Sequence, residues 1–270
     1  MAIITISRGS YSRGKEVAEK VAARLGYRCI SREVILDASD YYHIPEIKMI
    51  KAIHDSPSIL ERFGHDKNCF VSYYQSALTQ NVRSDNVVYH GLAGHLLLKG
   101  VPHVLKVRII ADLEERVLNE MEREGIPKQE ALSQILNDDQ ERRKWTQNLY
   151  KVDPWDSSLY DLIIHIHKLT VADAVEFICK AVDLPQFKIT QESQQKMDDL
   201  ALASQVKAAL ILDFPGIFVK AEYGNILIYS KADDRLSHRL KERTKNIRDE
   251  IKGINYLEVH PGAVVPSDAI

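Results

Sequence analysis

The feature that most constrains this chain is a glycine-bounded loop near its start, residues 9–15, which reads Gly-Ser-Tyr-Ser-Arg-Gly-Lys. It follows an apolar run over residues 2–6, which predicts a buried strand, and precedes a pattern over 14–25 that predicts an amphipathic helix. The spacing G-x-x-x-x-G-K between strand and helix is the Walker A pattern, in which backbone N–H groups and the helix N-terminus hold a phosphate. The sequence therefore predicts a phosphate site, against the alternative of an unliganded turn between a strand and a helix.

The residue after the lysine departs from this pattern. Walker loops carry Ser or Thr there, and the hydroxyl binds Mg²⁺, whereas this chain carries Glu16. A glutamate can reach a metal through water, or it can be an acidic residue of the first helical turn that the helix dipole favours. The phosphate site is therefore the firmer prediction, and no residue is assigned as a metal ligand.

Strand and helix patterns alternate over the first 182 residues. Apolar, β-branched runs predict strands at 2–6, 27–30, 86–90, 103–110 and 159–166. The stretches between them carry helical patterns, which is typical of crossover connections in a parallel sheet. The fold class predicted is α/β, a P-loop NTPase parallel sheet flanked by helices, with a small C-terminal α+β domain of α-β-β-α-β order.

The domain organisation follows from a change in composition. Residues 183–197 are polar and Gln-rich with one proline, which favours a linker between a domain at 1–182 and a second at 198–262. Within the second domain, Gly224-Asn225 lies between two apolar runs and predicts a β-hairpin. A chain of 270 residues is long enough for two such domains.

Composition excludes several classes of protein. Lys and Arg number 36 against 38 Asp and Glu, a balance that argues against a nucleic-acid partner. Cys29, Cys69 and Cys179 are far apart and form no CxxC pair, which fits neither a disulfide framework nor a zinc ribbon. The start of the chain lacks a signal-peptide pattern, and no run approaches the roughly 18 apolar residues of a membrane span. A cytoplasmic protein is expected.

Several segments in order resemble the cytidylate kinase-like family. They are residues 6–27, 31–35, 113–116 (Leu-Glu-Glu-Arg), 139–143 (Asp-Gln-Glu-Arg-Arg), 153–155 (Asp-Pro-Trp) and 159–164. The resemblance covers about residues 1–182, and the loop is its most specific part. Members of that family also tend to carry Arg/Lys-Glu after the second glycine, as Lys15-Glu16 do here.

The resemblance implies a nucleoside monophosphate kinase fold, with ATP and Mg²⁺ as cofactors and CMP or a similar nucleotide as acceptor. The donor phosphates would be held by Gly9, Ser10, Tyr11, Ser12, Arg13, Gly14, Lys15 and Glu16. Lys15, Arg142 and Arg143 would be catalytic, the two arginines from a mobile lid that neutralises the transferred phosphoryl group. A solvated helix face is the alternative for those arginines.

The acceptor side is where the chain departs from the family. The resemblance places Arg32 towards the acceptor, but the Gly-Arg usual after the third strand is replaced here by His90-Gly91. His90 or Arg108 would have to compensate for the missing arginine. The missing arginine leaves two alternatives open: an acceptor other than CMP, or acceptor phosphorylation that is weak or lost.

The C-terminal domain resembles a BON domain in residues 208–210, 217–229 and 253–259. Such modules are associated with membranes, ligands or partner proteins, which implies a partner or membrane contact; a folding or dimerising appendage is the alternative. Three functions follow for the whole chain. The leading hypothesis is ATP-dependent phosphoryl transfer to a nucleoside monophosphate, and the second is nucleotide sensing with weak or no kinase activity. A kinase of a non-nucleotide small molecule is the third.

Overall fold

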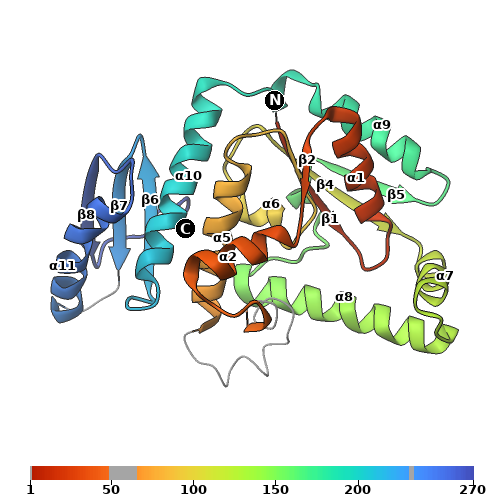
Figure 1. Cartoon of the computed structure of the whole chain (residues 1–270), viewed down its shortest axis with the longest axis horizontal. Helices are drawn as coiled ribbons and strands as arrows, with labels where there is room; N and C mark the ends of the chain where they lie inside the picture. The colour runs from red at the N-terminus through yellow and green to blue at the C-terminus, as the bar shows by residue number, and fades with distance from the viewer. Residues whose placement is uncertain (1, 49–65, 231–233) are drawn as a thin grey trace. The chain divides into compact units, whose positions relative to one another are not determined.

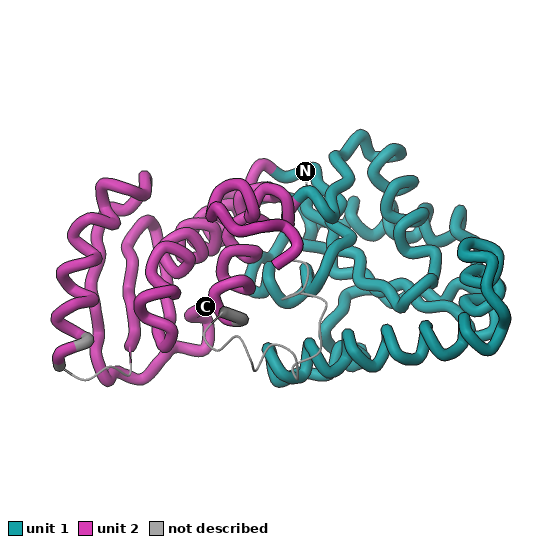
Figure 2. Tube along the Cα trace, turned by 60° about the horizontal axis from the view of Figure 1, so that its bottom comes forward, with its two compact units in different colours: residues 1–33, 54–58, 85–189 teal, residues 34–53, 59–84, 190–270 magenta. Residues whose placement is uncertain are grey.

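The computed structural model describes residues 2–48, 66–230 and 234–270. The chain forms two compact units, coloured separately in Figure 2. Among the described residues, the first unit holds 2–33 and 85–189, and the second holds 34–48, 66–84, 190–230 and 234–270. Each unit is therefore built from stretches that are far apart in the sequence.

The first unit contains a five-stranded parallel sheet of order β2-β3-β1-β4-β5. Its strands are β1 (Ile3–Arg8), β2 (Arg28–Ile30), β3 (Val87–Tyr89), β4 (Val104–Ala111) and β5 (Leu162–Ile166). The predicted α/β fold with a parallel sheet is confirmed. Each of the five runs expected to form strands within residues 1–182 contributes one strand to this sheet. The inner strands β1, β3 and β4 are the most deeply buried, whereas the outer strands β2 and β5 keep exposed residues.

Helices α1 (Gly14–Leu25) and α9 (Val171–Val182) lie side by side on one face of this sheet (Figure 1). Ile4 and Ile6 of β1 join the same apolar cluster as Val17 of α1 and Ile178 of α9. Successive strand residues point to opposite faces, so Ile4 and Ile6 share one side while Thr5 faces the other. This packing fixes β1 and α1, and with them the loop that joins the two.

Two helices follow β4 and form a hairpin, α7 (Leu113–Glu124) and α8 (Lys128–Tyr150). The chain reverses after α7 at Gly125, whose φ of 66° is left-handed and favours glycine. Val117 of α7 packs against Ile135 of α8, and Tyr11 of the glycine-bounded loop packs against this small cluster. The hairpin therefore lies against the loop. A short 3₁₀ turn, η2 (Ser157–Leu159), precedes β5.

The second unit has a three-stranded sheet of order β6-β7-β8. Its elements are α2 (Glu33–Tyr42, Glu33 itself in the first unit), α5 (Asp66–Val82), α10 (Gln191–Leu210), β6 (Ile217–Glu222), β7 (Asn225–Ser230), α11 (Asp234–Glu250) and β8 (Tyr256–Pro261). Strands β6 and β7 are antiparallel, while β7 and β8 are parallel. The order of α10 to β8 is thus the α-β-β-α-β order expected.

The predicted hairpin between β6 and β7 is confirmed. Tyr223 and Gly224, with φ of 50° and 74°, form its two-residue turn, and Glu222 pairs with Asn225. Both left-handed positions fit a type I′ turn, whose twist matches that of the strands. The carboxylate of Asp199 on α10 accepts hydrogen bonds from the N–H groups of Tyr223 and Gly224 at 3.1 and 3.3 Å.

The boundary between the two units differs from the one expected from composition. Helix α10 begins at Gln191, inside the segment 183–197 expected as a linker, because Thr190 and Ser193 form a reciprocal capping box. A polar, Gln-rich stretch is compatible with a helix as well as with a linker. Residues 34–48 and 66–84, expected to belong with 1–182, cluster with the C-terminal part, since α5 packs against α10.

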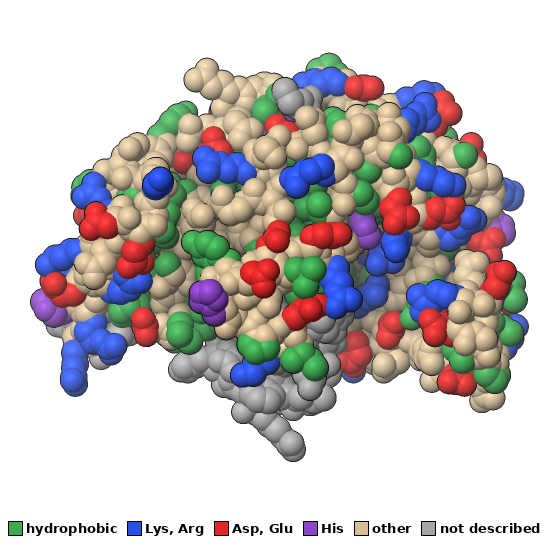
Figure 3. All heavy atoms as spheres, in the orientation of Figure 1, with side chains coloured by type: hydrophobic (Ala, Val, Ile, Leu, Met, Phe, Trp, Pro, Cys, Tyr) green, Lys and Arg blue, Asp and Glu red, His purple; other side chains and the backbone are tan. Residues whose placement is uncertain are grey.

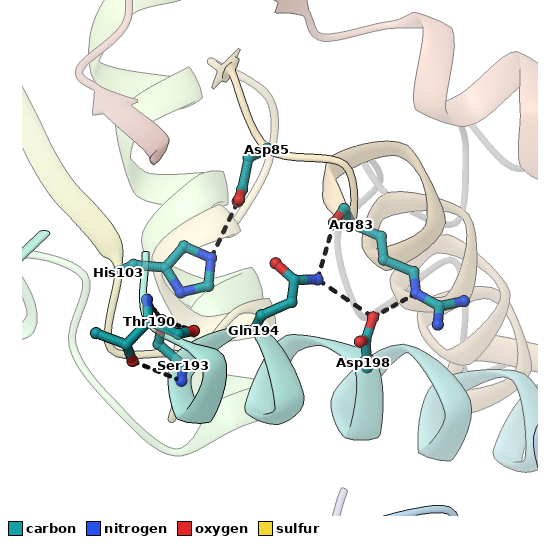
Figure 4. Close-up of polar contacts among 7 residues, drawn as sticks. All are labelled: Arg83, Asp85, His103, Thr190, Ser193, Gln194 and Asp198. Carbon is teal, nitrogen blue, oxygen red and sulfur yellow. Dashed lines mark hydrogen bonds and ion pairs between the residues drawn. The ribbon is translucent and has the colours of Figure 1, made fainter. Parts of the chain in front are cut away.

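Each unit has its own polar contacts close to the points where the chain passes between units (Figure 4). In the first unit, His103 Nε2 lies 3.0 Å from the Asp85 carboxylate, and both side chains are buried. In the second unit, Arg83 Nε donates to Asp198 at 2.5 Å, and Gln194 donates to the same carboxylate at 3.2 Å. These contacts anchor residues 83 and 85 within their respective units.

On the face shown in Figure 3, acidic and basic side chains are interspersed, as the balanced composition predicts. No helix among the described residues is long and apolar enough to cross a membrane.

Candidate active site

The loop after β1 has an unusual backbone. Tyr11 and Arg13 have φ of 59° and 61°, left-handed values that cost free energy for residues other than glycine. The neighbouring strand holds this conformation: Gly9 N–H donates to the carbonyl of Ile109 on β4 at 3.3 Å, and Ser12 Oγ contacts the same carbonyl at 3.2 Å. The loop is thus fixed at the carboxyl end of β4, with α1 beginning directly after it.

A salt bridge from the helical hairpin also holds the loop. Arg116 of α7 donates from Nε to the carbonyl of Ser10 at 2.6 Å and pairs through Nη2 with Asp139 of α8 at 2.7 Å. Asp139 in turn accepts from Ser10 N–H at 3.2 Å. Both residues belong to segments that resemble the family, but no pattern in the sequence assigns them this role, because the contacts join positions more than 100 residues apart.

Lys15 is the second residue of α1, and its side chain is 64% exposed. Its Nζ lies 3.7 Å from the carboxylate of Glu19, one helical turn further along. The ammonium expected over the phosphates is therefore paired on the outer surface of the helix.

Glu16 is paired as well. Its two carboxylate oxygens accept from Lys20 Nζ at 2.8 Å and from Arg13 Nε at 2.9 Å. The hydrogen bond from Lys20 is the largest cause that lowers the pKa of Glu16, and Arg13 adds to it. A carboxylate already paired with two cations is a poor ligand for Mg²⁺. Within residues 2–48, 66–230 and 234–270 there is no cluster of three or more His, Cys, Asp or Glu side chains suited to a metal.

Arg8 ends β1, and its side chain passes over Gly14. A Cβ built on Gly14 would lie 2.7 Å from Cβ and 3.0 Å from Cδ of Arg8, so glycine is needed at position 14 to admit this side chain. Arg8 is partly buried. Burial lowers the pKa of Arg8, and the positive charge of Arg142 lowers it further.

The two expected lid arginines are adjacent in α8 but differ in environment. Arg143 is bound to Asp153 through Nε at 3.1 Å, and its guanidinium stacks on the ring of Trp155 at 4.2 Å. The hydrogen bond from Arg143 lowers the pKa of Asp153. Arg142, by contrast, forms no ion pair with any residue that the structure describes. Its charge acts on Arg8, next to the loop.

The three residues expected on the acceptor side fall into different surroundings. Arg32 is exposed in the turn between β2 and α2. His90 follows β3 and is buried; burial lowers its pKa, and Arg8 is the next cause. Arg108 of β4 donates through Nη1 to the carbonyl of Pro154 at 2.7 Å and to the Tyr160 hydroxyl at 3.1 Å. His90 is thus grouped with Arg8, whereas Arg108 is held by the segment before β5.

Beside Arg108 lies a second buried histidine, His95. His95 Nε2 is 3.3 Å from the Tyr160 hydroxyl, and its ring lies against that of Tyr160. Burial, with Arg108 as the second cause, lowers the pKa of His95 to about 3. His95 is therefore neutral at physiological pH. This group fixes the direction of Arg108.

Sheet order and loop together define the class of protein. A parallel sheet whose central first strand leads through a glycine-bounded loop into a helix, with a helical hairpin packed against that loop, is the architecture of P-loop nucleotide-binding proteins. Residues 3–168 match the family model described as "Cytidylate kinase-like family". The chain belongs to this family.

Relatives described as cytidylate kinases agree with the family match. A cytidylate kinase of Archaeoglobus fulgidus is 28% identical over 193 residues, which cover 70% of this chain and 99% of the relative. A cytidylate kinase of Methanocaldococcus jannaschii is 33% identical over 103 residues, but this match covers only 37% of the chain and 58% of the relative. The chain is therefore a kinase-like protein at the level of its family.

A solved structure with a similar fold is that of an uncharacterized protein from Eubacterium ventriosum. It is 21% identical, with a TM-score of 0.53, and the match covers 68% of this chain and 99% of that one. At this identity the likeness concerns the fold alone. It extends over about two thirds of the chain, which is close to the extent of the family match.

Proposed function

We propose that this protein transfers a phosphoryl group from ATP to a small acceptor, with a nucleoside monophosphate such as CMP as the first candidate. The observation that carries the proposal is the loop after β1, held by Arg116 and Asp139, in a chain of the cytidylate kinase-like family. Arg8 and Arg142 lie near it and form no ion pair with an acid among the residues that the structure describes. Phosphoryl transfer needs positioning and charge stabilisation and little covalent work by the protein. This site offers both.

The donor phosphates would lie at the loop, Gly9 to Glu16, against the N-terminus of α1. The helix dipole and free N–H groups there favour an anion. Arg142 is the candidate for stabilising charge on the transferred group, because it is a cation near the loop that no carboxylate neutralises in the described chain. The roles of Lys15 and Arg143 stay predictions, and each of these cations is paired with an acid here.

Mg²⁺ fits this site as a companion of the nucleotide. Glu16 is already paired with two cations, so the protein offers little direct ligation at the loop. Magnesium commonly keeps several waters and binds mainly through the phosphates of its substrate. When bound, it would neutralise phosphate charge. The residues of this chain would position the same phosphates through N–H groups and guanidinium groups.

On the acceptor side, we propose His90 and Arg32 as the residues that face the acceptor. His90 is buried beside Arg8, and its lowered pKa keeps it neutral, so its ring can donate or accept a hydrogen bond. Arg108 is a weaker candidate, since Pro154 and Tyr160 already hold its guanidinium. A non-nucleotide acceptor is the second candidate, because His90-Gly91 stands where Gly-Arg was expected after β3.

For the C-terminal part we propose a BON-like binding module that contacts a partner protein or a membrane surface of a cytoplasmic protein. The α-β-β-α-β order of α10 to β8 supports this resemblance. The proposal for the kinase site does not depend on it.

The function is tested by ADP release. Purified full-length protein is incubated with ATP, Mg²⁺ and single acceptors: the nucleoside monophosphates, then hydroxylated small molecules. We expect ADP formation that depends on CMP or another pyrimidine monophosphate. The variant Arg142→Ala should lose most of kcat, whereas Lys144→Ala, an exposed cation of the same helix, should retain it. Failure of every acceptor to stimulate ADP formation would refute the proposal.

A further inference from the structure

The spacing of the loop residues does not show which side chain places a positive charge near the phosphate site. In a Walker loop the lysine after the second glycine reaches the phosphates. Here Lys15 lies on the surface of α1 near Glu19, with 64% of its side chain exposed. In this conformation Lys15 is paired with Glu19, so a cation held in a fixed position next to the loop is the better candidate for the positive charge at short range.

Arg8 is in the position to do so. It is the last residue of β1, directly before the loop, and its side chain crosses Gly14 at the start of α1. The fit is close, since Gly14 has no room for a Cβ. The aliphatic part of the Arg8 side chain is thus held between the beginning and the end of the loop, which restricts where its guanidinium can lie.

The surroundings of Arg8 are cationic. Its pKa is lowered first by burial and then by Arg142, and Arg8 in turn lowers the pKa of His90. In the described part of the chain Arg8 forms no ion pair with a carboxylate, although Arg13, Lys15, Arg116 and Arg143 nearby all do. A partly buried guanidinium beside a second one destabilises the protein unless an anion joins them.

We propose that Arg8, rather than Lys15, is the residue that binds the donor phosphates at the loop, with Arg142 approaching the same phosphates from the helical hairpin. The inference rests on the proposed function in that the anion is taken to be the triphosphate of ATP. A guanidinium suits this role because its planar donors bind two phosphate oxygens at once. Gly14 serves, in part, to admit the stem of Arg8.

The test compares Arg8→Met, Lys15→Met and Arg24→Met. Each variant removes one positive charge, and Arg24 is an exposed residue in the last turn of α1, which makes it the matched control. Methionine at position 8 keeps an unbranched stem that can cross Gly14. The affinity for ATP with Mg²⁺ is measured by calorimetry, and the melting temperature is measured with and without ATP. Arg8→Lys tests whether charge alone suffices.

We expect Arg8→Met to raise the Kd for ATP tenfold or more, with Lys15→Met and Arg24→Met within about twofold of the natural chain. Arg8→Lys should fall between. Without ATP, Arg8→Met should melt at the same or a higher temperature, because it removes an unpaired cation. A merely structural arginine would give the opposite sign.

An equal or larger loss of ATP affinity in Lys15→Met, or an Arg8→Met variant indistinguishable from Arg24→Met, overturns the inference. So does a lower melting temperature of Arg8→Met without ATP, combined with unchanged ATP affinity. If ATP binding depends on Arg8 but no acceptor is phosphorylated, only the proposed function is refuted. If the natural chain does not bind ATP, both the proposed function and the inference about Arg8 are refuted.

Discussion

The salt bridge between Arg116 and Asp139 gives the sharpest prediction about the loop. The change is Asp139→Asn, which keeps the shape of the side chain and an oxygen that can accept from Ser10 N–H, and removes only the charge. Arg116 then stays close to the Ser10 carbonyl without its ionic partner. Because the Nη2–Oδ2 distance is 2.7 Å, the substitution acts on a direct contact.

The magnitude follows from burial. Removing one partner of a fully buried ion pair costs about 3–5 kcal/mol, whereas an exposed pair contributes about 0–1 kcal/mol. The side chains of Arg116 and Asp139 are 11% and 18% exposed, which lies near the buried limit. We therefore expect the free energy of unfolding to fall by about 2–3 kcal/mol. ATP affinity should fall several-fold as well, since Tyr11 and Arg13 need their left-handed conformation to be held.

Urea unfolding, followed by circular dichroism, measures the stability, and calorimetry measures ATP binding. Glu176→Gln is the control: it removes a carboxylate from an exposed i,i+4 pair with Lys180 on α9 and should change neither quantity measurably. The reasoning is refuted if Asp139→Asn and Glu176→Gln are equally stable. It is also refuted if Asp139→Asn loses stability with no change in ATP affinity, because the bridge would then not hold the loop.

Three further predictions concern stability. Burial lowers the pKa of His95 from 6.5 to about 3, so the unfolded chain binds its proton first and stability should fall as pH drops from about 6.5 towards about 3; His95→Gln should flatten this part of a pH–melting curve. Burial lowers the pKa of Lys207 to about 8, so Lys207→Met should raise the free energy of unfolding at pH 7 by about 1–3 kcal/mol in urea titrations, and an unchanged midpoint would contradict this. Gly224→Ala places a Cβ 2.7 Å from Asn255 Nδ2 at φ 74°, which should lower the melting temperature clearly, while Gly216→Ala, with open space around it, should not.

The sheet of the first unit could be predicted because its evidence is local. Runs such as 2–6 and 103–110 are apolar and β-branched, and they became β1 (Ile3–Arg8) and β4 (Val104–Ala111). Alternation with helical patterns then predicts parallel strands, because each helical crossover returns the chain to the end of the sheet at which the previous strand began. Most strand ends shift by one or two residues, as strand boundaries commonly do, but β5 begins three residues later than expected, after the 3₁₀ turn η2.

The assignment of the lid arginines could not be completed in this way. Arg142 and Arg143 are neighbours of the same type, and the sequence treats them alike. They differ because Asp153 and Trp155 bind one of them, a contact made only when the chain folds back from α8. The helical period turns adjacent residues about 100° apart, so one faces Asp153 and the other does not. The difference between the two arginines therefore comes from tertiary contacts and not from composition.

The loop shows a different limitation: the motif gives the spacing of its residues but not the directions of their side chains. The spacing of Gly9, Gly14 and Lys15 is right, yet the direction of a side chain depends on the backbone of residues 11 and 13, which the pattern leaves unspecified. Arg8 stands one residue before the motif begins, and so the motif gives it no role. The sequence does carry one indication: an arginine at the end of a buried strand, next to a glycine loop, is a charge in a place where burial is costly.

The cations around the loop differ in whether they have a carboxylate partner. A net charge of −2 suggests a chain whose charges cancel, and close to the loop they do cancel pair by pair. The cations with carboxylate partners there are Arg13, Lys15, Lys20, Arg116 and Arg143. Arg8 and Arg142 lack such partners among the described residues, and they are the two whose charges act on each other. Among the described residues, the positive charges of Arg8 and Arg142 are thus left without acidic partners close to the loop that leads into α1, where a helix N-terminus and a glycine loop favour phosphate.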